Sequence, residues 1–291
     1  MNQETDSRIW LAYTVREQIR ITDMYSLFQA HFHKGYAFPG ETHNFWECLY
    51  VIDGEVCVSG NERVYNLSGG SIIFHKPLEL HKFIVNGQEG ADLLIFSYTA
   101  EGPLTAFLEE KVFRLSQGQQ EIIASMLSFI RSRNQQLCTS QTDSHPGAAP
   151  SDLAPFLTSP TYSQMVATYL QQLMLSLAET GSVSSVSDAP DAVTFRHAIS
   201  YLNSNIHRQP SVPELARFCS VSEAGLKRIF DKYAGIGIHK YLLKLKVNAA
   251  AELLQKGESV SSVAEKLGFN SQSYFSRAFR RETGVMPSSL K

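Results

Sequence analysis

His43 and Glu47 are the residues of the N-terminal half whose types and spacing point most directly to chemistry. If this stretch forms a strand, alternate side chains share one face, and that face contains His43, Phe45, Glu47, Leu49 and Val51. An imidazole and a carboxylate on an interior face can hold a metal ion, hydrogen-bond a small polar ligand, or satisfy each other as a buried pair. The spacing alone leaves these three interpretations open.

The C-terminal third contains one residue pattern twice. The first copy consists of Leu215-Ala216, Ser220-Val221-Ser222, Leu226, Arg228, Phe230 and Gly235-Ile236. The second consists of Val263-Ala264, Gly268-Phe269-Asn270, Phe275, Arg277, Phe279 and Gly284-Val285. The offset is 48 residues before the turn and 49 after it, so one residue is inserted in the second copy. Each copy predicts a short helix, a tight turn and a second helix that begins at a Ser or Asn cap. Such a helix-turn-helix unit places its second helix in the major groove of DNA.

Polar residues on the outer faces of these two second helices could supply the hydrogen bonds that groove recognition needs. In the first copy, Leu226, Ile229 and Phe230 are expected to be buried, which turns outward Glu223, Ala224, Lys227 and Arg228. In the second copy, Tyr274 or Phe275 is expected to be buried with Ala278 and Phe279, and the outward residues are Ser271, Gln272, Ser273 and Arg277. Arg and Lys suit guanine edges or phosphates, and Gln suits adenine. A solvated helix face explains any one of these residues, but their shared position in two copies favours DNA recognition.

Gly225 distinguishes the two copies. We expect it in the middle of the first recognition helix, where Gly costs about 1 kcal/mol relative to Ala. This expectation favours the second copy as the dominant reader of DNA.

Charge is divided unequally along the chain. Residues 193–291 contain 15 Lys and Arg against 7 Asp and Glu, a net charge of +8, whereas residues 1–192 have a net charge of −10. A basic part neutralises phosphates, and an acidic part avoids DNA. Because the basic part coincides with the repeat, the charge supports nucleic-acid binding over an ordinary surface distribution.

The elements that must position these residues differ between the two halves. Residues 22–100 are rich in β-branched and aromatic residues, with turn signals such as Asp53-Gly54 and Asn86-Gly87, which predicts an antiparallel sandwich or barrel. Apolar residues at helical spacing predict amphipathic helices over 117–136 and 161–178. These two helices either form a dimer interface or cover their own barrel. The predicted fold class is multidomain, with an all-β barrel followed by helices and an all-α C-terminal module.

Composition sets the expected domain boundaries. Residues 1–115 are expected to form the sensing barrel, and residues 116–180 a helical segment with a mobile, Ser- and Pro-rich loop over 138–160. Residues 181–192 are expected to be a flexible linker, and residues 193–291 the helical module. Within that module, helices are expected over 193–207, 238–256 and 259–267, in addition to the second helices already described.

Some classes of protein are excluded by what the sequence lacks. No apolar run is long enough to cross a membrane, and the N-terminus does not resemble a signal peptide. The four cysteines have no C-x-x-C spacing and lie among apolar neighbours: Cys48, Cys57, Cys138 and Cys219. Buried free thiols of this kind indicate a reducing compartment, so we expect a cytoplasmic protein.

The C-terminal part closely resembles the AraC/XylS family of transcriptional regulators. The matching residues are Glu214-Leu215-Ala216, Ser220-Val221-Ser222, Leu226-Lys227-Arg228-Ile229-Phe230, Gly235, Tyr241, Ala250, Leu253-Leu254, Val263-Ala264, Gly268-Phe269, Tyr274-Phe275-Ser276-Arg277-Ala278-Phe279, Gly284-Val285 and Pro287. Lys246 stands where the family usually has Arg, and Met286 and Leu290 replace the usual Thr and Tyr. The resemblance implies a seven-helix module that sets two recognition helices into successive major grooves. It also implies a homodimer, RNA polymerase as a partner, and activation more often than repression.

The N-terminal part resembles, more loosely, the cupin-type barrel that many of these regulators use as a sensor. Gly35, Glu41, His43, Glu47 and Gly54 follow the first cupin motif, with Glu41 in place of the usual first His, and Leu67-Ser68-Gly69-Gly70, Pro77 and His81 look like the second. The candidate effector-binding residues are Tyr36, Glu41, His43, Phe45, Glu47 and His81. Two imidazoles and two carboxylates could hold a metal, hydrogen-bond a polar effector such as a sugar, or form a purely structural pair. We assign no metal and no cofactor here. Trp46 has outward parity and is expected to pack under a helix.

These observations lead to two hypotheses of different classes. The first is a transcription factor that binds operator DNA and responds to a small-molecule effector, possibly a sugar, with no enzymatic activity and no membrane partner. The alternative is a metal-dependent cupin enzyme, an isomerase or dioxygenase, fused to a DNA-binding module. Glu41, which replaces a ligand His of the cupin motif, distinguishes them and favours the regulator.

Overall fold

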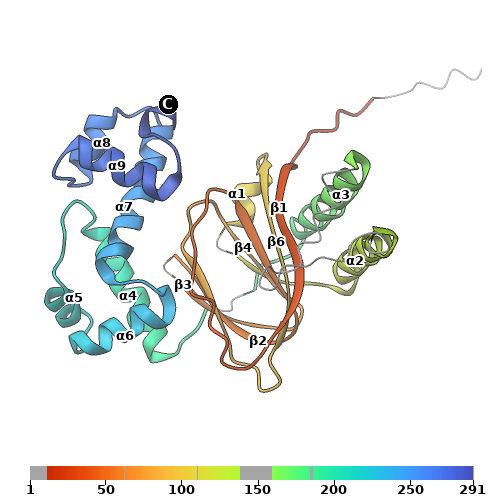
Figure 1. The fold of residues 1–291 in the computed structure, drawn as a ribbon, viewed down its shortest axis with the longest axis horizontal. Coiled ribbons are helices and arrows are strands. Elements are labelled where there is room, and N and C mark those ends of the chain that lie inside the picture. Colours follow the sequence, from red (N-terminus) through yellow and green to blue (C-terminus); the bar gives the residue numbers. More distant parts are fainter. Residues whose placement is uncertain (1–11, 62, 110, 138–158, 184–185, 291) are drawn as a thin grey trace, which may run out of the picture.

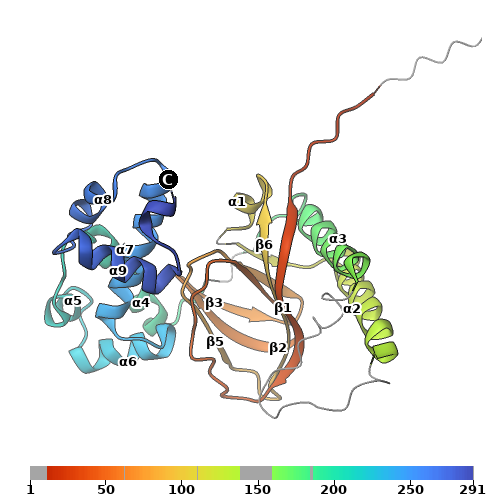
Figure 2. The ribbon, with the colours of Figure 1, turned by 45° about the horizontal axis from the view of Figure 1, so that its top comes forward.

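The chain is arranged in three parts. The computed structural model describes residues 12–61, 63–109, 111–137, 159–183 and 186–290. A β-sheet domain lies in the middle, the helices of residues 190–290 lie on one side of it, and two helices of residues 117–177 lie on the other side (Figure 1). A second view shows the same order (Figure 2).

The sheet domain is built around one long strand. Seven antiparallel strands are present in the described residues: β1 (Arg20–Phe32), β2 (Trp46–Gly60), β3 (Arg63–Ser68), β4 (Ser71–His75), β5 (His81–Val85), β6 (Ala91–Glu101) and β7 (Val112–Arg114). The first part of β2 pairs with β4 and β6, and its second part pairs with β3 and β5. The path β1-β6-β2-β4-β7 does not close on itself among the described strands, so the expected barrel is an open one.

Gly54 marks the point where β2 passes from one set of partners to the other. Its φ is +89°, which favours Gly, and a Cβ there would lie 2.3 Å from the Gly90 carbonyl oxygen. A register shift between Val51 and Asp53 lies just before it. The long strand can therefore bend and serve both parts of the domain.

Alternating side chains of β2 build two different cores. Trp46, Cys48 and Tyr50 pack against α2 (Gln117–Leu137) and α3 (Pro160–Leu177). Leu49 and Val51 point the other way, into the core between the two parts of the sheet. The predicted packing of Trp46 under a helix is confirmed, and the two predicted helices agree with the structure to within one residue. Both helices cover their own sheet; α1 (Leu104–Leu108) is a short helix beside them.

The C-terminal module consists of α4 (Pro190–Ser204), α5 (Val212–Phe218), α6 (Glu223–Ala234), α7 (Ile238–Gln255), α8 (Val260–Lys266), α9 (Gln272–Thr283) and a 3-10 turn over Pro287–Leu290. The first of these begins three residues earlier than predicted because Pro190 occupies its first turn. Two cores follow the repeat: one joins α4 to α6 and the start of α7, and the other joins the rest of α7 to α8 and α9.

The segment expected to be a flexible linker is hydrogen-bonded to the sheet where the structure describes it. The Val183 amide donates to the Val112 carbonyl at 2.8 Å, and the Ser187 amide donates to the Val64 carbonyl at 2.7 Å. Its last three residues, 190–192, belong to α4. Of the loop expected over 138–160, residues 138–158 lie outside the described residues. None of the helices in the described part of the chain is long and apolar enough to span a bilayer.

Candidate functional site: a nucleic-acid interface and a buried polar cluster

The two helix-turn-helix units have the same caps. The Ser222 hydroxyl accepts a hydrogen bond from the Gly225 amide at 3.1 Å, and the Ser271 hydroxyl accepts one from the Tyr274 amide at 3.1 Å. Both recognition helices, α6 and α9, end at a left-handed Gly, Gly235 and Gly284. These caps lie 49 residues apart, as predicted. Gly225 lies in the first turn of α6 rather than mid-helix, so the expected weakness of the first copy was wrong.

The outer faces of both recognition helices contain the predicted residues. Leu226, Ile229 and Phe230 of α6 are buried, and the exposed residues are Glu223, Ala224, Lys227 and Arg228. In α9, Phe275, Ala278 and Phe279 are buried, and the exposed residues are Ser271, Gln272, Ser273 and Arg277. The structure therefore places both predicted sets on open surface. Sequence reasoning missed Tyr274, which is 44% exposed next to these residues, because its neighbour Phe275 satisfies the same helical spacing.

The turns of the two units place one residue in a left-handed conformation. It is Ser220 in the first unit, with φ 57°, and Gly268 in the second, with φ 64°. A Cβ at Gly268 would lie 1.7 Å from the His207 carbonyl oxygen, which belongs to the loop after α4. The turn of the second unit therefore packs against the loop after α4, and only Gly fits at this position.

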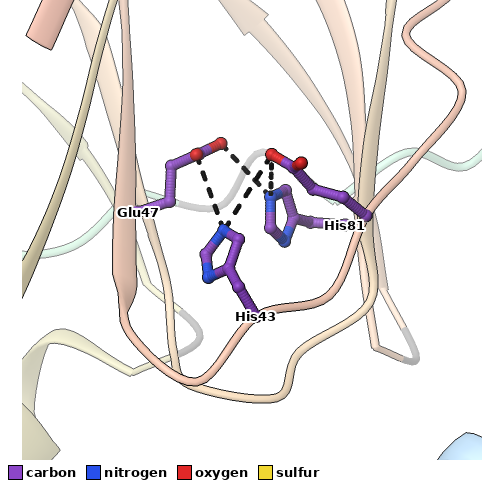
Figure 3. A group of neighbouring side chains, drawn as sticks. His43, Glu47 and His81 are labelled. Atoms are coloured by element: carbon purple, nitrogen blue, oxygen red, sulfur yellow. Dashed lines mark ion pairs between the residues drawn. The ribbon is translucent and has the colours of Figure 1, made fainter. Parts of the chain in front are cut away.

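Four polar side chains meet at one end of the sheet domain, and we call Glu41, His43, Glu47 and His81 the polar cluster. Glu47 belongs to β2 and His81 begins β5, whereas Glu41 and His43 lie in the segment that precedes β2. The face-sharing argument was wrong for His43 and Phe45, since the strand begins only at Trp46. His43 nevertheless reaches Glu47, and the two imidazoles point toward the Glu47 carboxylate (Figure 3).

Distances within the polar cluster are short. The His81 Nε2 atom lies 3.2 Å from Glu47 Oε1 and 3.7 Å from Glu41 Oε1. The His43 Nε2 atom lies 3.6 Å from Glu47 Oε2 and 4.0 Å from Glu41 Oε1. The side chain of His81 is only 4% exposed, whereas that of Glu41 is 45% exposed, so the cluster is buried on one side and open on the other.

Neighbouring groups of the cluster shift the pKa values of His81 and Glu47. Burial lowers the pKa of His81, but the Glu41 and Glu47 carboxylates more than offset this and raise it to about 10. Burial raises the pKa of Glu47, but the two imidazoles lower it well below its usual range. The cluster therefore gathers negative charge that a cation or a proton must balance.

A second buried pair supports the cluster. His75 Nδ1 lies 3.0 Å from Glu79 Oε1, and the His75 ring stacks on His81 with centroids 4.5 Å apart. Sequence reasoning missed this pair, although His75, Glu79 and His81 are spaced closely enough to have signalled it.

Of the two aromatic candidates for the effector site, only Phe45 lies beside the polar cluster. Phe45 stacks on the His43 ring, with centroids 3.9 Å apart, and belongs beside the polar cluster. Tyr36 packs instead against Phe32 and Phe83, at 4.8 and 5.9 Å, on the segment that pairs with the far end of β5. The structure does not bring Tyr36 to the cluster.

The cysteines in the described residues are free thiols. Cys48 and Cys57 are buried, and Cys219 is half-buried. The fourth, Cys138, lies outside the described residues.

Comparison with known proteins finds a matching domain family for each of the two parts of the chain. Residues 26–101 match the model of an AraC-like ligand binding domain, and residues 215–291 match that of a helix-turn-helix domain. The uncharacterized HTH-type transcriptional regulator YidL of Escherichia coli is 28% identical over 252 residues, which cover 85% of this chain and 75% of YidL. The HTH-type transcriptional activator RhaS of Pectobacterium carotovorum is 26% identical over 263 residues, which cover 88% of each chain.

A further relative matches over a shorter stretch of the chain. The raffinose operon transcriptional regulatory protein RafR of Pediococcus pentosaceus is 32% identical over 95 residues, which cover 32% of this chain and 34% of RafR. All three relatives are transcriptional regulators by name. The chain belongs to the AraC family of transcriptional regulators, with a ligand-binding domain ahead of its helix-turn-helix domain.

Proposed function

We propose that this regulator activates transcription when a small polar effector, of the carbohydrate class, binds its sheet domain. The observation that carries the DNA-binding part is the similarity of α6 and α9. Each helix begins at a Ser cap and ends at a left-handed Gly, and each buries one face and exposes the other. The name of RhaS, an activator, supports activation, and the name of RafR, of a raffinose operon, supports a sugar.

The two recognition helices contact successive major grooves of operator DNA. In the first, Lys227 and Arg228 bind guanine edges or phosphates, with Glu223 and Ala224 beside them at the start of α6. In the second, Gln272 suits adenine and Arg277 suits guanine, with Ser271 and Ser273 in hydrogen-bonding reach of the backbone. All eight side chains are exposed, as this role requires.

The effector is recognised by the residues around the polar cluster. Glu41, His43, Glu47 and His81 supply hydrogen-bond partners, and Phe45 supplies an aromatic surface for a sugar face. Tyr36, which packs against Phe32 and Phe83 away from the cluster, is not part of this proposed site. Effector binding shifts the module between DNA-binding states through the contacts of the two parts.

The proposed organisation assigns 1–115 to effector sensing, 116–180 to the covering helices, 181–192 to the connection and 193–291 to DNA binding. The regulator acts as a homodimer, because family resemblance implies one, and it recruits RNA polymerase at its promoter. A protein with this role works in the cytoplasm, where the DNA is. It needs neither catalytic activity nor a membrane partner, and the relatives reported above give no support to an enzyme.

Fluorescence anisotropy with DNA from upstream of its own gene tests the proposal. We expect sequence-selective binding over a scrambled duplex, with affinity that falls steeply as salt rises. A panel of mono- and disaccharides, added at fixed DNA concentration, then tests the effector class. Equal affinity for scrambled DNA, with and without the sugars, would contradict the proposal.

A further inference from the structure

A pocket of about 340 Å³ lies in the DNA-binding module, where the two helix-turn-helix units meet. It is lined by Gln209 of the loop that leads to the first unit, by Lys240 and Lys246 of α7, and by residues of the second unit. The latter include Phe269, in the turn before α9, and Tyr274 of α9. A ligand bound in this pocket would therefore contact both units at once.

The pocket and the sheet domain lie on opposite faces of α7. Because successive residues of an α-helix are rotated by about 100°, His239 and Lys246 share one face, and both line the pocket. The residues that hydrogen-bond to the sheet domain share the opposite face: Tyr241, Lys244 and Asn248. The sheet domain thus contacts α7 from the side away from the pocket.

Lys246 is a buried cation without an anionic partner. It is only 6% exposed, and it makes no ion pair or hydrogen bond with the described part of the chain. Its Nζ atom lies 5.4 Å from the centre of the Phe269 ring, which is a cation–π contact. Burial lowers the pKa of Lys246, and no carboxylate among the described residues opposes this shift. Since burying an unpaired charge is unfavourable, an anion bound beside Lys246 would stabilise it.

The other charged residues of the pocket are cationic as well. Lys240 is exposed, and Arg281 is exposed and pairs with Glu282 at 3.0 Å. No Asp or Glu of the described chain lines the pocket itself. Ammonium and guanidinium groups form charge-assisted hydrogen bonds with phosphate oxygens. The lining therefore suits an oxyanion such as phosphate.

The pocket adjoins the part of the second unit that is proposed to contact DNA. Asn270 and Tyr274 line the pocket, and they flank the proposed contact residues 271–273 along the chain. When two recognition helices occupy successive major grooves, one stretch of sugar-phosphate backbone lies between them. A bound operator would bring the phosphates of this stretch to the region where the two units meet.

We propose that this pocket binds a backbone phosphate of the operator between the two major grooves, with Lys246 and Lys240 as its cationic partners. The proposal rests on the proposed function and adds a DNA contact that belongs to neither recognition helix. A phosphate held between the two units fixes the spacing of α6 and α9 on the DNA. Such a contact sets the position of the protein on the duplex and contributes equally to all sequences.

Fluorescence anisotropy with the full-length protein tests the site on upstream DNA and on a scrambled duplex, over a range of salt concentrations. Lys246→Met removes the charge and keeps a long side chain. We expect it to weaken binding to both duplexes by the same factor, about 10-fold, and to reduce the salt slope by about 0.9. Lys246→Arg, which keeps the charge, should retain the wild-type slope. Lys256→Met, at the other end of α7 and outside the pocket, is the matched control and should leave the slope unchanged.

Thermal unfolding separates phosphate binding from a structural role. Replacing an unpaired buried cation by Met should leave the Tm unchanged or raise it. Lys240→Met, at an exposed position that tolerates substitution, should also reduce the salt slope and leave the Tm in place. An unchanged slope in both Lys246→Met and Lys240→Met would overturn the site.

Calorimetric titration with inorganic phosphate, in the absence of DNA, tests the source of the anion. We expect only weak binding of free phosphate, because the proposed ligand is part of the operator. Saturable binding that Lys246→Met abolishes, together with an unchanged DNA salt slope in that variant, would overturn DNA as the source. Equal affinity of the wild-type protein for upstream and scrambled DNA would count against the proposed function instead, since the salt slope can be measured on either duplex.

Discussion

The two helix-turn-helix units have the same local design but different relations to the sheet domain. The core of the first unit includes Cys57, Val64 and Leu80 of the sheet domain, whereas that of the second takes up only Leu78 among the described residues. Hydrogen bonds from Ser59 and Lys82 end on the last turn of α6, the first recognition helix. The sheet domain therefore contacts the first recognition helix directly, whereas its described contacts with the second unit are the packing of Leu78 in that unit's core and hydrogen bonds to α7. The two copies of one motif therefore differ in how closely they pack against the sheet domain.

The largest expected effect comes from removing one aromatic side chain from each core. Phe230→Ala and Phe279→Ala should each lower the free energy of unfolding by about 3–5 kcal/mol, because both side chains are fully buried. Both tryptophans, residues 10 and 46, lie in the N-terminal half, so their fluorescence during urea unfolding reports on that half. We expect Phe230→Ala to shift the fluorescence transition and Phe279→Ala to leave it nearly in place. Equal shifts would show that the two units couple equally to the sheet.

Ser220 and Gly268 occupy equivalent left-handed turn positions in the two units. Gly268→Ala should destabilise the protein by about 1–3 kcal/mol or more, because a left-handed backbone disfavours Ala and its Cβ meets the His207 carbonyl. At the equivalent position of the first unit, Ser220→Gly should be neutral or stabilise by up to about 1 kcal/mol. Thermal unfolding followed by circular dichroism measures both. A harmless Gly268→Ala would mean that the two units do not pack as described.

DNA affinity tests which of the two helix-turn-helix units contributes more to base recognition. Arg228→Ala and Arg277→Ala occupy equivalent exposed positions, and each should cost about 1–3 kcal/mol if it reads a base. Binding to a set of single-base operator variants separates the roles. Relaxed specificity at one position indicates a base contact, whereas uniform weakening with a salt slope reduced by about 1 indicates a phosphate contact.

The smallest expected effect is a change in thiol reactivity. Burial raises the pKa of Cys57 to about 11, so at pH 8 only about one thiol in a thousand is ionised and alkylation is slow. Because Cys57 packs in the core shared with the first unit, Lys82→Ala should increase its labelling rate a few-fold by loosening that contact. Lys244→Ala, which removes contacts to Thr42 and to α9, should change it less. Lys34→Ala, at an exposed position, serves as the control.

The sequence predicted the helical module more fully than the sheet domain. Ser222, Ser271 and the terminal glycines are local signals, because a cap depends only on residues within one turn. The helices expected over 193–207, 238–256 and 259–267 lie within three residues of α4, α7 and α8, and in place of the seventh helix that the resemblance implied the structure has a 3-10 turn over Pro287–Leu290. The exposed faces of α6 and α9 were predicted from the helical spacing of their apolar residues.

The polar cluster was predicted by residue but not by geometry. His43 was placed on β2, although the strand begins three residues later, because alternation does not show where a strand starts. The support from His75 and Glu79, and the close approach of Pro39 to Gly235, depend on contacts between distant parts of the chain. Such contacts leave no periodic signal, and neither do the hydrogen bonds of Val183 and Ser187 to the sheet.

The shared core has a consequence for fragments of this protein. Leu80, Val64 and Cys57 cover apolar side chains of α4 and α6 that would face water if the chain were cut near residue 193. Exposed apolar patches of this kind promote self-association, so the isolated DNA-binding fragment should be poorly soluble and bind DNA as aggregates. We therefore expect the acidic residues 1–192 to keep the basic C-terminal third of this regulator in solution.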